Sequence, residues 1–427
     1  MFLFGKSRIL ATPRGPIAAL LALAIALTGA TARPTAASAQ EGSVPAPVWD
    51  ASLSGEICLP AESASPDSPP GSISAKAAVL MEAQSGELVF SKNPDVPLPM
   101  ASTTKIMTAL VALEQISPTT AVTIPAEAVG IEGSSVYLCE GETLTMEELL
   151  YALLLASAND AAVAIAIAVA GSVEAFADLM NRKAAALGLT DTHFVNPHGL
   201  DAEGHHTTAR ELAIIARAAL ENARFREICA TRRKAIPLNG APRGRWLLNH
   251  NKLLSMYPGC IGVKTGYTKK TGRCLVSAAE REGVTLIAVT LGAPDDWQDH
   301  TAMLNFGFKQ YTAVPLCDGS FFSSPLPVVG GTREYVLVEN TASLTLTLPQ
   351  KHGSIRCVVE LPRFDYAPIA EGQTVGRLVF YEEEADGGLR ELGDVPLTAA
   401  YGADAVIYRY GPWEKIKNLF LGSSKGS

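Results

Sequence analysis

The hydrophobic positions between residues 76 and 310 follow two spacings, which predict strands at both ends of this region and helices between them. Ala77–Glu82 and Glu87–Ser91 flank the turn sequence Ala83-Gln-Ser-Gly86 and predict a hairpin. Flanking strands around a helical insertion predict an α+β fold, in which an antiparallel sheet is covered by helices. The other predicted strands are Ile261–Thr265, Arg273–Ala279 and Val284–Leu291, and the predicted helices are Met100–Glu114, Glu147–Leu155, Ala161–Ala170 and one after Asp299.

Beyond about Val314 the chain changes to short alternating runs bounded by Gly, Pro and Asp. These runs predict a small all-β domain over residues 314–410. No group of residues in this part of the sequence indicates chemistry. The clearest runs are Glu334–Val338, Leu344–Leu348, Arg356–Leu361 and Val375–Tyr381.

Both ends of the chain are typical of an exported protein. Residues 1–39 combine a basic start, an apolar stretch and a final Ala-Ser-Ala, which predicts a signal peptide; an uncleaved membrane anchor is the alternative. Residues 40–75 are rich in Ser, Pro and Ala and predict a linker. Residues 411–427 carry a proline, Pro412, at the predicted start of a helix, and the helix that follows is amphipathic. This tail either lies on a membrane through residues 411–421 or docks on the β domain.

The composition narrows the range of partners and cofactors. A formal net charge of −8 argues against nucleic-acid binding, which usually needs a basic surface. The seven cysteines contain no Cys-x-x-Cys, so neither a zinc site nor a thioredoxin-like motif is indicated, and we interpret them as mostly buried or free thiols. His198, His205 and His206 follow no metal-binding spacing, and we expect no metal and no cofactor.

Three short motifs carry the candidate chemistry: Ser102-Thr-Thr-Lys105, Ser157-Ala-Asn159 and Lys264-Thr265-Gly266, in that order. Ser102 and Lys105 are three residues apart and therefore share one face of a helix. A serine hydroxyl becomes an effective nucleophile when a base takes its proton, and Lys105 can do so if burial and a nearby cation such as Lys264 lower its pKa. The set predicts acyl transfer through a serine acyl-enzyme, without a metal or a histidine base.

Each motif is weak alone, and two of them occur twice. Ser102 is the only serine with a lysine three residues on, but a capped surface helix could produce the same pattern. Ser91-Lys-Asn93 precedes a proline and predicts a turn, and Lys270-Thr-Gly272 lies in a polar stretch that predicts a hairpin. The three motifs in order, each in fitting local context, favour the catalytic interpretation.

The sequence around the motifs resembles the low-molecular-weight penicillin-binding proteins that are serine-type D-alanyl-D-alanine carboxypeptidases. The resemblance is strong over roughly residues 76–310 and looser over the remainder. It implies a β-lactamase/transpeptidase-like fold for the expected peptidase domain, residues 76–313. It also implies an exported protein at the outer face of the cell membrane or in the cell wall, with the tail resting on the membrane. The segments that carry it are Leu98–Glu114, Leu155–Ile165, Phe194–Leu200, His206–Ala213 and Gly262–Thr268.

The resemblance implies a substrate and a role for each motif residue. The substrate would be a peptidoglycan stem pentapeptide, and β-lactam antibiotics would be covalent inhibitors. Ser102 would be the nucleophile and Lys105 its general base, Ser157 would relay a proton to the leaving amine, and Asn159 would orient Lys105 and the substrate. Lys264 and Thr265 would hold the terminal carboxylate. Gly266 would allow close approach of the substrate, and the backbone N–H groups of Ser102 and Tyr267 would form the oxyanion hole.

The sequence departs from the family pattern in one loop, and two alternative functions stay open. Many relatives carry an arginine after the strand Val284–Gly292, whereas Ala293–His300 contains none, which puts the affinity for the carboxylate in question. A β-lactamase would need a further base to activate water, and Glu147 and Glu148 are predicted on a different helix from Ser102. A catalytically silent protein that binds wall peptides or β-lactams is the other alternative, which the intact motifs disfavour.

Overall fold

The computed structural model describes residues 70–238, 244–384 and 386–407. The predicted signal peptide (1–39), most of the predicted linker (40–75) and the predicted amphipathic tail (411–427) lie outside these residues. The last residues of the expected linker are part of the folded structure, which corrects that boundary. Ile73 and Ala75 are buried, and the backbone N–H and hydroxyl of Ser74 both donate to Asp299, so this segment is anchored by packing and hydrogen bonds.

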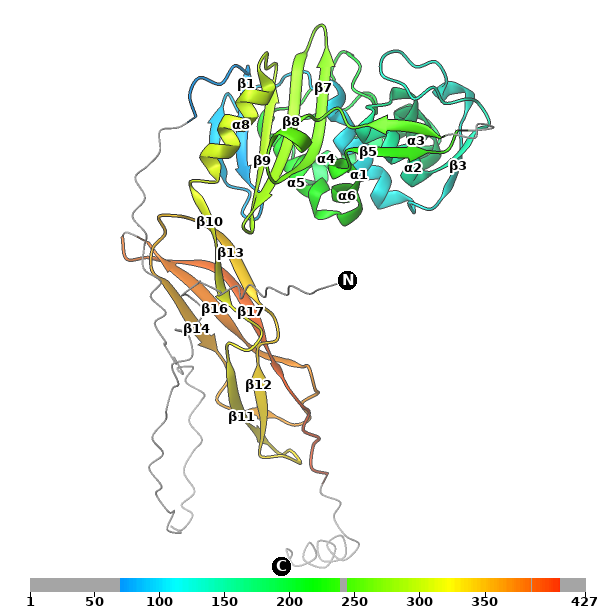
Figure 1. Ribbon diagram of the computed structural model, residues 1–427. Coiled ribbons are helices and arrows are strands. Elements are labelled where there is room, and N and C mark those ends of the chain that lie inside the picture. The colour runs from blue at the N-terminus through cyan, green and yellow to red at the C-terminus, as the bar shows by residue number, and fades with distance from the viewer. Residues whose placement is uncertain (1–69, 239–243, 385, 408–427) are drawn as a thin grey trace, which may run out of the picture. The chain divides into compact units, whose positions relative to one another are not determined.

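A five-stranded antiparallel sheet forms the frame of the first folded region (Figure 1). Its order is β2-β1-β9-β8-β7, so β7, which carries Lys264-Thr265-Gly266, is an edge strand. The predicted strands are confirmed, although β7 extends beyond the predicted Ile261–Thr265 because its pairing with β8 continues to Thr268. The bounds are β1 Ala77–Glu82, β2 Leu88–Lys92, β7 Cys260–Thr268, β8 Gly272–Arg281 and β9 Val284–Leu291.

A largely helical insertion connects β2 to β7 and packs on one face of this sheet. The predicted helix Met100–Glu114 begins as a 3-10 turn, η1 (Ala101–Thr104), and continues as α1 (Lys105–Gln115). The other helices are α2 (Met146–Leu155), α3 (Asn159–Ala170), α4 (Val173–Ala186), α5 (Ala209–Glu221), α6 (Ala223–Ala230) and α7 (Leu253–Met256). Short elements between them are β3 (Ala121–Thr123), η2 (Ala126–Ala128), β4 (Thr143–Thr145), β5 (Arg233–Ile236) and β6 (Arg245–Leu248).

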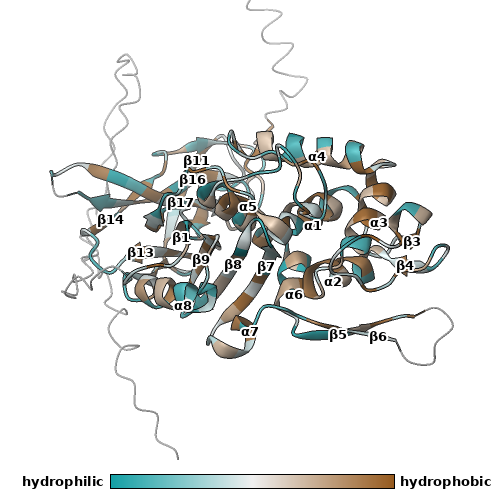
Figure 2. Ribbon diagram, turned by 90° about the horizontal axis from the view of Figure 1, so that it is seen from above, coloured by the Kyte–Doolittle hydropathy of each residue, from teal (hydrophilic) through white to brown (hydrophobic). Residues whose placement is uncertain are grey.

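The first eight residues of the helix α3 are buried in the core, which accounts for its apolar sequence. Figure 2 shows the hydrophobic colour along much of this helix. In the part of the chain that the structure describes, no single helix is long and apolar enough to span a membrane; α3 and α4 pass that test only as a pair bent by 82°. The burial of α3 confirms the interpretation of the run Ala161–Ala170 as a core helix rather than a membrane span.

The opposite face of the sheet is covered by α8 (Asp296–Gly307). This helix begins three residues before Asp299, where the sequence placed its start. Asp296 and Asp299 therefore lie in its first turn, where carboxylates favourably oppose the partial positive charge of a helix N-terminus. The stretch after β9 is consequently a short loop followed at once by a helix.

From β10 onward the chain forms strands, and the residues from Val314 on pack around a hydrophobic cluster of their own. Five of the strands follow the order β14-β16-β17-β12-β11 in an antiparallel sheet, β15 adds to β11 in parallel, and β10 pairs with β13. All four alternating runs of the sequence lie on strands. The bounds are β10 Tyr311–Cys317, β11 Ser323–Val329, β12 Tyr335–Glu339, β13 Leu344–Pro349, β14 Ile355–Glu360, β15 Asp365–Tyr366, β16 Thr374–Glu383 and β17 Leu389–Ala399.

Candidate active site

Ser102 and Lys105 meet where η1 passes into α1, as the three-residue spacing predicted. The Lys105 side chain is fully buried, and its Nζ lies 3.0 Å from the Oγ of Ser102. The same Nζ donates to the Oδ1 of Asn159 at 2.7 Å and to the carbonyl of His198 at 2.5 Å. Neither of these oxygens can donate in return. If the amine is neutral, both N–H bonds are thus occupied and its lone pair is left for the Ser102 hydroxyl.

The surroundings of Lys105 favour that neutral form. Burial lowers the pKa of Lys105 well below its ordinary value, and the positive charge of Lys264 lowers it further, while Asp160 opposes the shift. Desolvation and a like charge both disfavour an ammonium ion. A neutral Lys105 can accept the Ser102 proton, which is what a general base at this position requires.

The second motif lies at the junction between α2 and α3. Ser157 precedes α3 with a positive φ of 59°, and Asn159 is the first residue of that helix. The Nδ2 of Asn159 donates to the Glu132 carbonyl at 2.6 Å, and its backbone N–H donates to the Ser134 carbonyl at 2.7 Å. These bonds fix the amide so that its oxygen faces Lys105.

The third motif reaches the second from the edge strand β7. The Nζ of Lys264 is buried and donates to the Oγ of Ser157 at 3.0 Å and to the carbonyl of Thr265 at 2.8 Å. Burial lowers the pKa of Lys264 to about 7. The first and third motifs are more than 150 residues apart in the sequence. All three motifs nevertheless form one connected group around Ser102.

Gly266 lies against the turn that carries the nucleophile. A Cβ atom at this position would lie 3.0 Å from the backbone N of Ser102 and 3.1 Å from the Met100 carbonyl. A side chain at this position would therefore crowd the backbone around Ser102, and the expected role of Gly266 in substrate approach stays a prediction. Tyr267 follows with a 65% exposed side chain.

The comparisons with known proteins agree with this geometry. Residues 62–295 match the peptidase S11 family model, described as D-alanyl-D-alanine carboxypeptidase. The chain belongs to this family. It is 35% identical to D-alanyl-D-alanine carboxypeptidase DacF of Bacillus subtilis over 72% of this chain and 82% of the relative. It is 36% identical to D-alanyl-D-alanine carboxypeptidase of Streptomyces sp. over 55% of this chain and 88% of the relative.

A solved structure of penicillin-binding protein 5 from Haemophilus influenzae superimposes with a TM-score of 0.60. It is 27% identical and covers 79% of this chain and all of its own. The likeness confirms the transpeptidase-like fold that the motifs implied. The family assignment therefore rests on the sequence and on the fold together.

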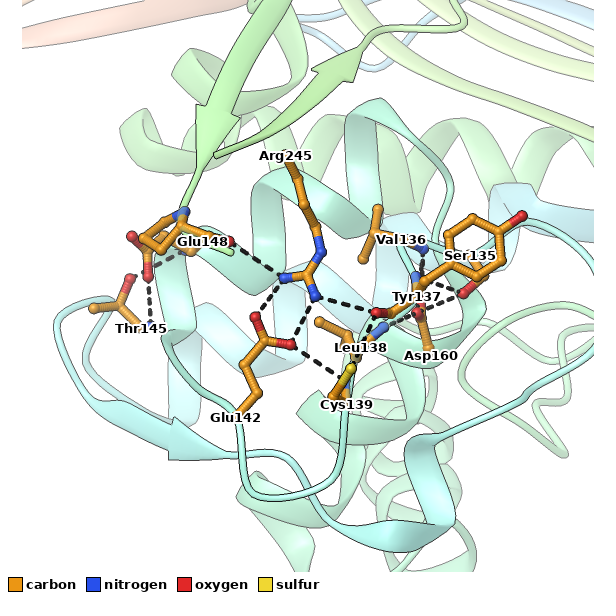
Figure 3. Close-up of polar contacts among 11 residues, drawn as sticks. Ser135, Val136, Tyr137, Leu138, Cys139, Glu142, Thr145, Glu148, Asp160 and Arg245 are labelled. Carbon is orange, nitrogen blue, oxygen red and sulfur yellow. Dashed lines mark hydrogen bonds and ion pairs between the residues drawn. The ribbon is translucent and has the colours of Figure 1, made fainter. Parts of the chain in front are cut away.

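Asp160 was not identified from the sequence. Its carboxylate holds in place the segment that borders the site. Its carboxylate accepts from the Ser135 hydroxyl at 2.6 Å, from the Val136 N–H at 3.1 Å and from the Leu138 N–H at 3.0 Å (Figure 3). Tyr137 between them has a positive φ of 57° and an 83% exposed ring. The segment after Glu132 is thereby tied to the residue next to Asn159.

An ion pair holds the far end of the same segment. The Arg245 guanidinium on β6 contacts both oxygens of Glu142, at 2.5 and 2.7 Å, and donates to the Tyr137 carbonyl at 3.1 Å (Figure 3). Both side chains are largely buried, with exposed fractions of 9% and 2%. Neither residue belongs to a motif, so the sequence offered no signal that could have identified them.

His205 has a structural role next to the turn that carries Ser102. The Nδ1 of His205 accepts from the Val195 N–H, so its Nε2 carries the proton and donates to the Thr104 hydroxyl at 2.8 Å. Thr104 in turn donates to the carbonyl of Ala101, the residue before the nucleophile. Burial is the main reason that the pKa of His205 falls to about 4 and that of His198 to about 3, so both rings are neutral near pH 7.

The duplicate motifs lie where the sequence placed them. Lys92 ends β2 and Asn93 turns with a positive φ of 47°, and Lys270 lies in the turn between β7 and β8. The sequence context thus distinguished the motif copies of the site from the two others.

Proposed function

We propose that this chain is a serine-type D-Ala-D-Ala carboxypeptidase that removes the terminal D-alanine from peptidoglycan stem pentapeptides. The observation that carries the proposal is the buried Lys105 amine, 3.0 Å from the Ser102 hydroxyl and depressed in pKa. A buried lysine with a lowered pKa can act as a base, whereas a solvated lysine is protonated and can act only as a partner in ion pairs. Membership of the family supplies the substrate class.

Acylation follows from the hydrogen bonds of the site. The Ser102 proton passes to Lys105 as the Oγ–C bond forms at the carbonyl between the two D-alanines. The C–N bond then breaks, and the leaving amine takes the proton that Lys105 received, passed on through the Ser157 hydroxyl, so that Lys105 is neutral again for deacylation. Asn159 keeps Lys105 aimed at Ser102, and the N–H groups of Ser102 and Tyr267 stabilise the oxyanion. Thr265 and Lys264 face the terminal carboxylate, and Gly266 lets β7 approach the nucleophile.

Deacylation reverses the same proton path. Water attacks the ester carbonyl, gives its proton to Lys105, and Ser102 regains a proton as the acid leaves. A fast β-lactamase needs a carboxylate that activates water for deacylation. Neither glutamate of α2 is free for this role. Glu148 accepts from the Thr145 N–H in a helix cap at 2.8 Å, and Glu147 pairs with Arg224 at 3.2 Å. A β-lactam that acylates Ser102 is therefore released slowly and acts as an inhibitor.

The place of action follows from the substrate, which lies outside the cytoplasmic membrane. The predicted signal peptide over residues 1–39 would export the chain, and the predicted amphipathic helix over residues 411–421 would add peripheral contact with the membrane surface. Both segments lie outside the described residues and rest on the sequence pattern.

The test is release of free D-alanine by the purified chain from an acyl-Lys-D-Ala-D-Ala peptide, with and without penicillin pretreatment. We expect release that penicillin abolishes. Rapid hydrolysis of penicillin without D-alanine release would instead favour a β-lactamase. Penicillin labelling with neither activity would favour a silent binding protein.

A further inference from the structure

The substrate of the proposed reaction ends in a carboxylate, and Lys264 alone is a poor counter-charge for it. Its Nζ is buried and already donates to Ser157 and to the Thr265 carbonyl. Burial lowers its pKa to about 7, so its positive charge is held less firmly than that of a solvated lysine. The stretch after β9 offers no replacement, because Ala293–His300 contains three aspartates and no cation other than the buried His300, whose pKa falls to about 3.

Arg273 brings a guanidinium to the same end of the sheet from the neighbouring strand. It lies directly opposite Tyr267, the residue after Lys264-Thr265-Gly266, in the β7–β8 ladder. The carbonyl of Arg273 also accepts from the Ala293 N–H at 2.8 Å. Arg273 therefore lies next to the loop after β9, which contains no arginine. Side chains two residues apart on a strand share a face, and opposed residues share it too. Thr265 and Arg273 therefore belong to one face of the ladder.

The guanidinium of Arg273 is held in place but only partly used. One nitrogen lies 2.8 Å from the Oδ1 of Asp296, and the group lies over the Trp297 ring at 5.5 Å from its centroid. The side chain remains 42% exposed, and its Nε is buried without a hydrogen-bond partner among the described residues. An arginine fork offers five N–H donors and pairs with carboxylates through two parallel bonds. This guanidinium is thus preorganised and keeps free donors.

We propose that Arg273 binds the terminal carboxylate of the substrate, together with Thr265, and makes the enzyme specific for a free C-terminus. Asp296 and Trp297 act as positioning residues that aim the guanidinium. The inference rests on the proposed function, because it assigns a binding residue for that reaction.

The test compares two peptides on the full chain: acyl-Lys-D-Ala-D-Ala with a free carboxylate and the same peptide as its C-terminal carboxamide. Losing a charged hydrogen bond should lower kcat/KM of Arg273→Gln for the free acid roughly 10- to 100-fold, mostly through KM, with little change for the carboxamide. Arg273→Lys should restore only part of the loss, because an ammonium ion lacks the fork. Arg281→Gln is the matched control; Arg281 also lies on β8 but packs over Tyr257 and Phe308.

A binding measurement separates this inference from the reaction itself. Calorimetry with the Ser102→Ala chain and the same two peptides reports carboxylate recognition even where no D-alanine is released. A preference for the free acid that disappears in Ser102→Ala/Arg273→Gln supports the assignment. Equal losses for both peptides would show a structural role for Arg273, and an unchanged preference would place the carboxylate elsewhere; either result overturns the proposal.

Discussion

The Nζ of Lys264 lies 3.0 Å from the hydroxyl of Ser157, and this contact joins the edge strand β7 to the helical insertion. Two buried lysines thereby share one site, Lys264 on the sheet and Lys105 on α1. Their mutual repulsion helps to keep Lys105 neutral. The second lysine thus acts on the candidate base.

This coupling predicts a shift in pH dependence when Lys264 is replaced by methionine. Lys105 acts as a base only when deprotonated, so acylation rises with pH through its depressed pKa. Loss of the neighbouring charge raises that pKa, and the acid limb of the profile should move to higher pH. The measurement is the rate of Ser102 acylation by a penicillin across pH, since its carboxylate keeps one charge in this range. A limb that stays in place, whatever the absolute rate, would contradict the coupling.

Replacement of Ser102 by alanine should abolish both D-alanine release and covalent labelling by penicillin. The reason is that both reactions form their bond at the same Oγ. Ser91→Ala, in the duplicate Ser-x-Asn motif at the end of β2, is the matched control and should retain both. Labelling that survives in Ser102→Ala, detected by mass spectrometry of the intact chain, would refute the nucleophile assignment.

Replacement of Gly266 by alanine should slow acylation about tenfold without unfolding the chain. The new Cβ would come within 3.0–3.1 Å of the backbone around Ser102, so the nucleophile must move by a few tenths of an ångström, and displacements of this order are costly to catalysis. Gly71→Ala is the control, because no atom lies within 4 Å of its added Cβ. The check is the acylation rate beside a thermal melt; an unchanged rate would mean that the turn accommodates the methyl group freely.

The sequence allowed prediction of the motif residues and the sheet because both have local signatures. Ser102 and Lys105 are close in sequence, and the strands of the sheet show hydrophobic runs bounded by turns. The His198 carbonyl was beyond prediction, because backbone atoms have no sequence signature and only the folded loop brings this one to Lys105. Asp160 was missed because an acidic residue in the first turn of a helix is common without any ligand.

The tail prediction concerns residues outside the described structure and is tested by deletion. Removing residues 411–427 should leave D-alanine release unchanged, because the candidate catalytic and substrate-binding residues lie between Ser102 and Tyr267. Sedimentation with anionic lipid vesicles should fall, because the apolar face of an amphipathic helix supplies such binding. Full retention of vesicle binding in the shortened chain would favour a helix docked on the β domain instead.

Replacement of Arg245 by methionine should destabilise the chain by roughly 3 kcal/mol, because it removes the guanidinium from a buried ion pair. The loss should also loosen the segment between Glu132 and Glu142, since Arg245 binds both Glu142 and the Tyr137 carbonyl. Arg226→Met is the matched control: its pair with Glu280 is exposed at 39% and 42%, and such pairs contribute about 0–1 kcal/mol. Urea unfolding gives both values. Equal, small losses would mean that the Arg245–Glu142 pair adds little to stability, and that the contacts of β6 with the segment are dispensable.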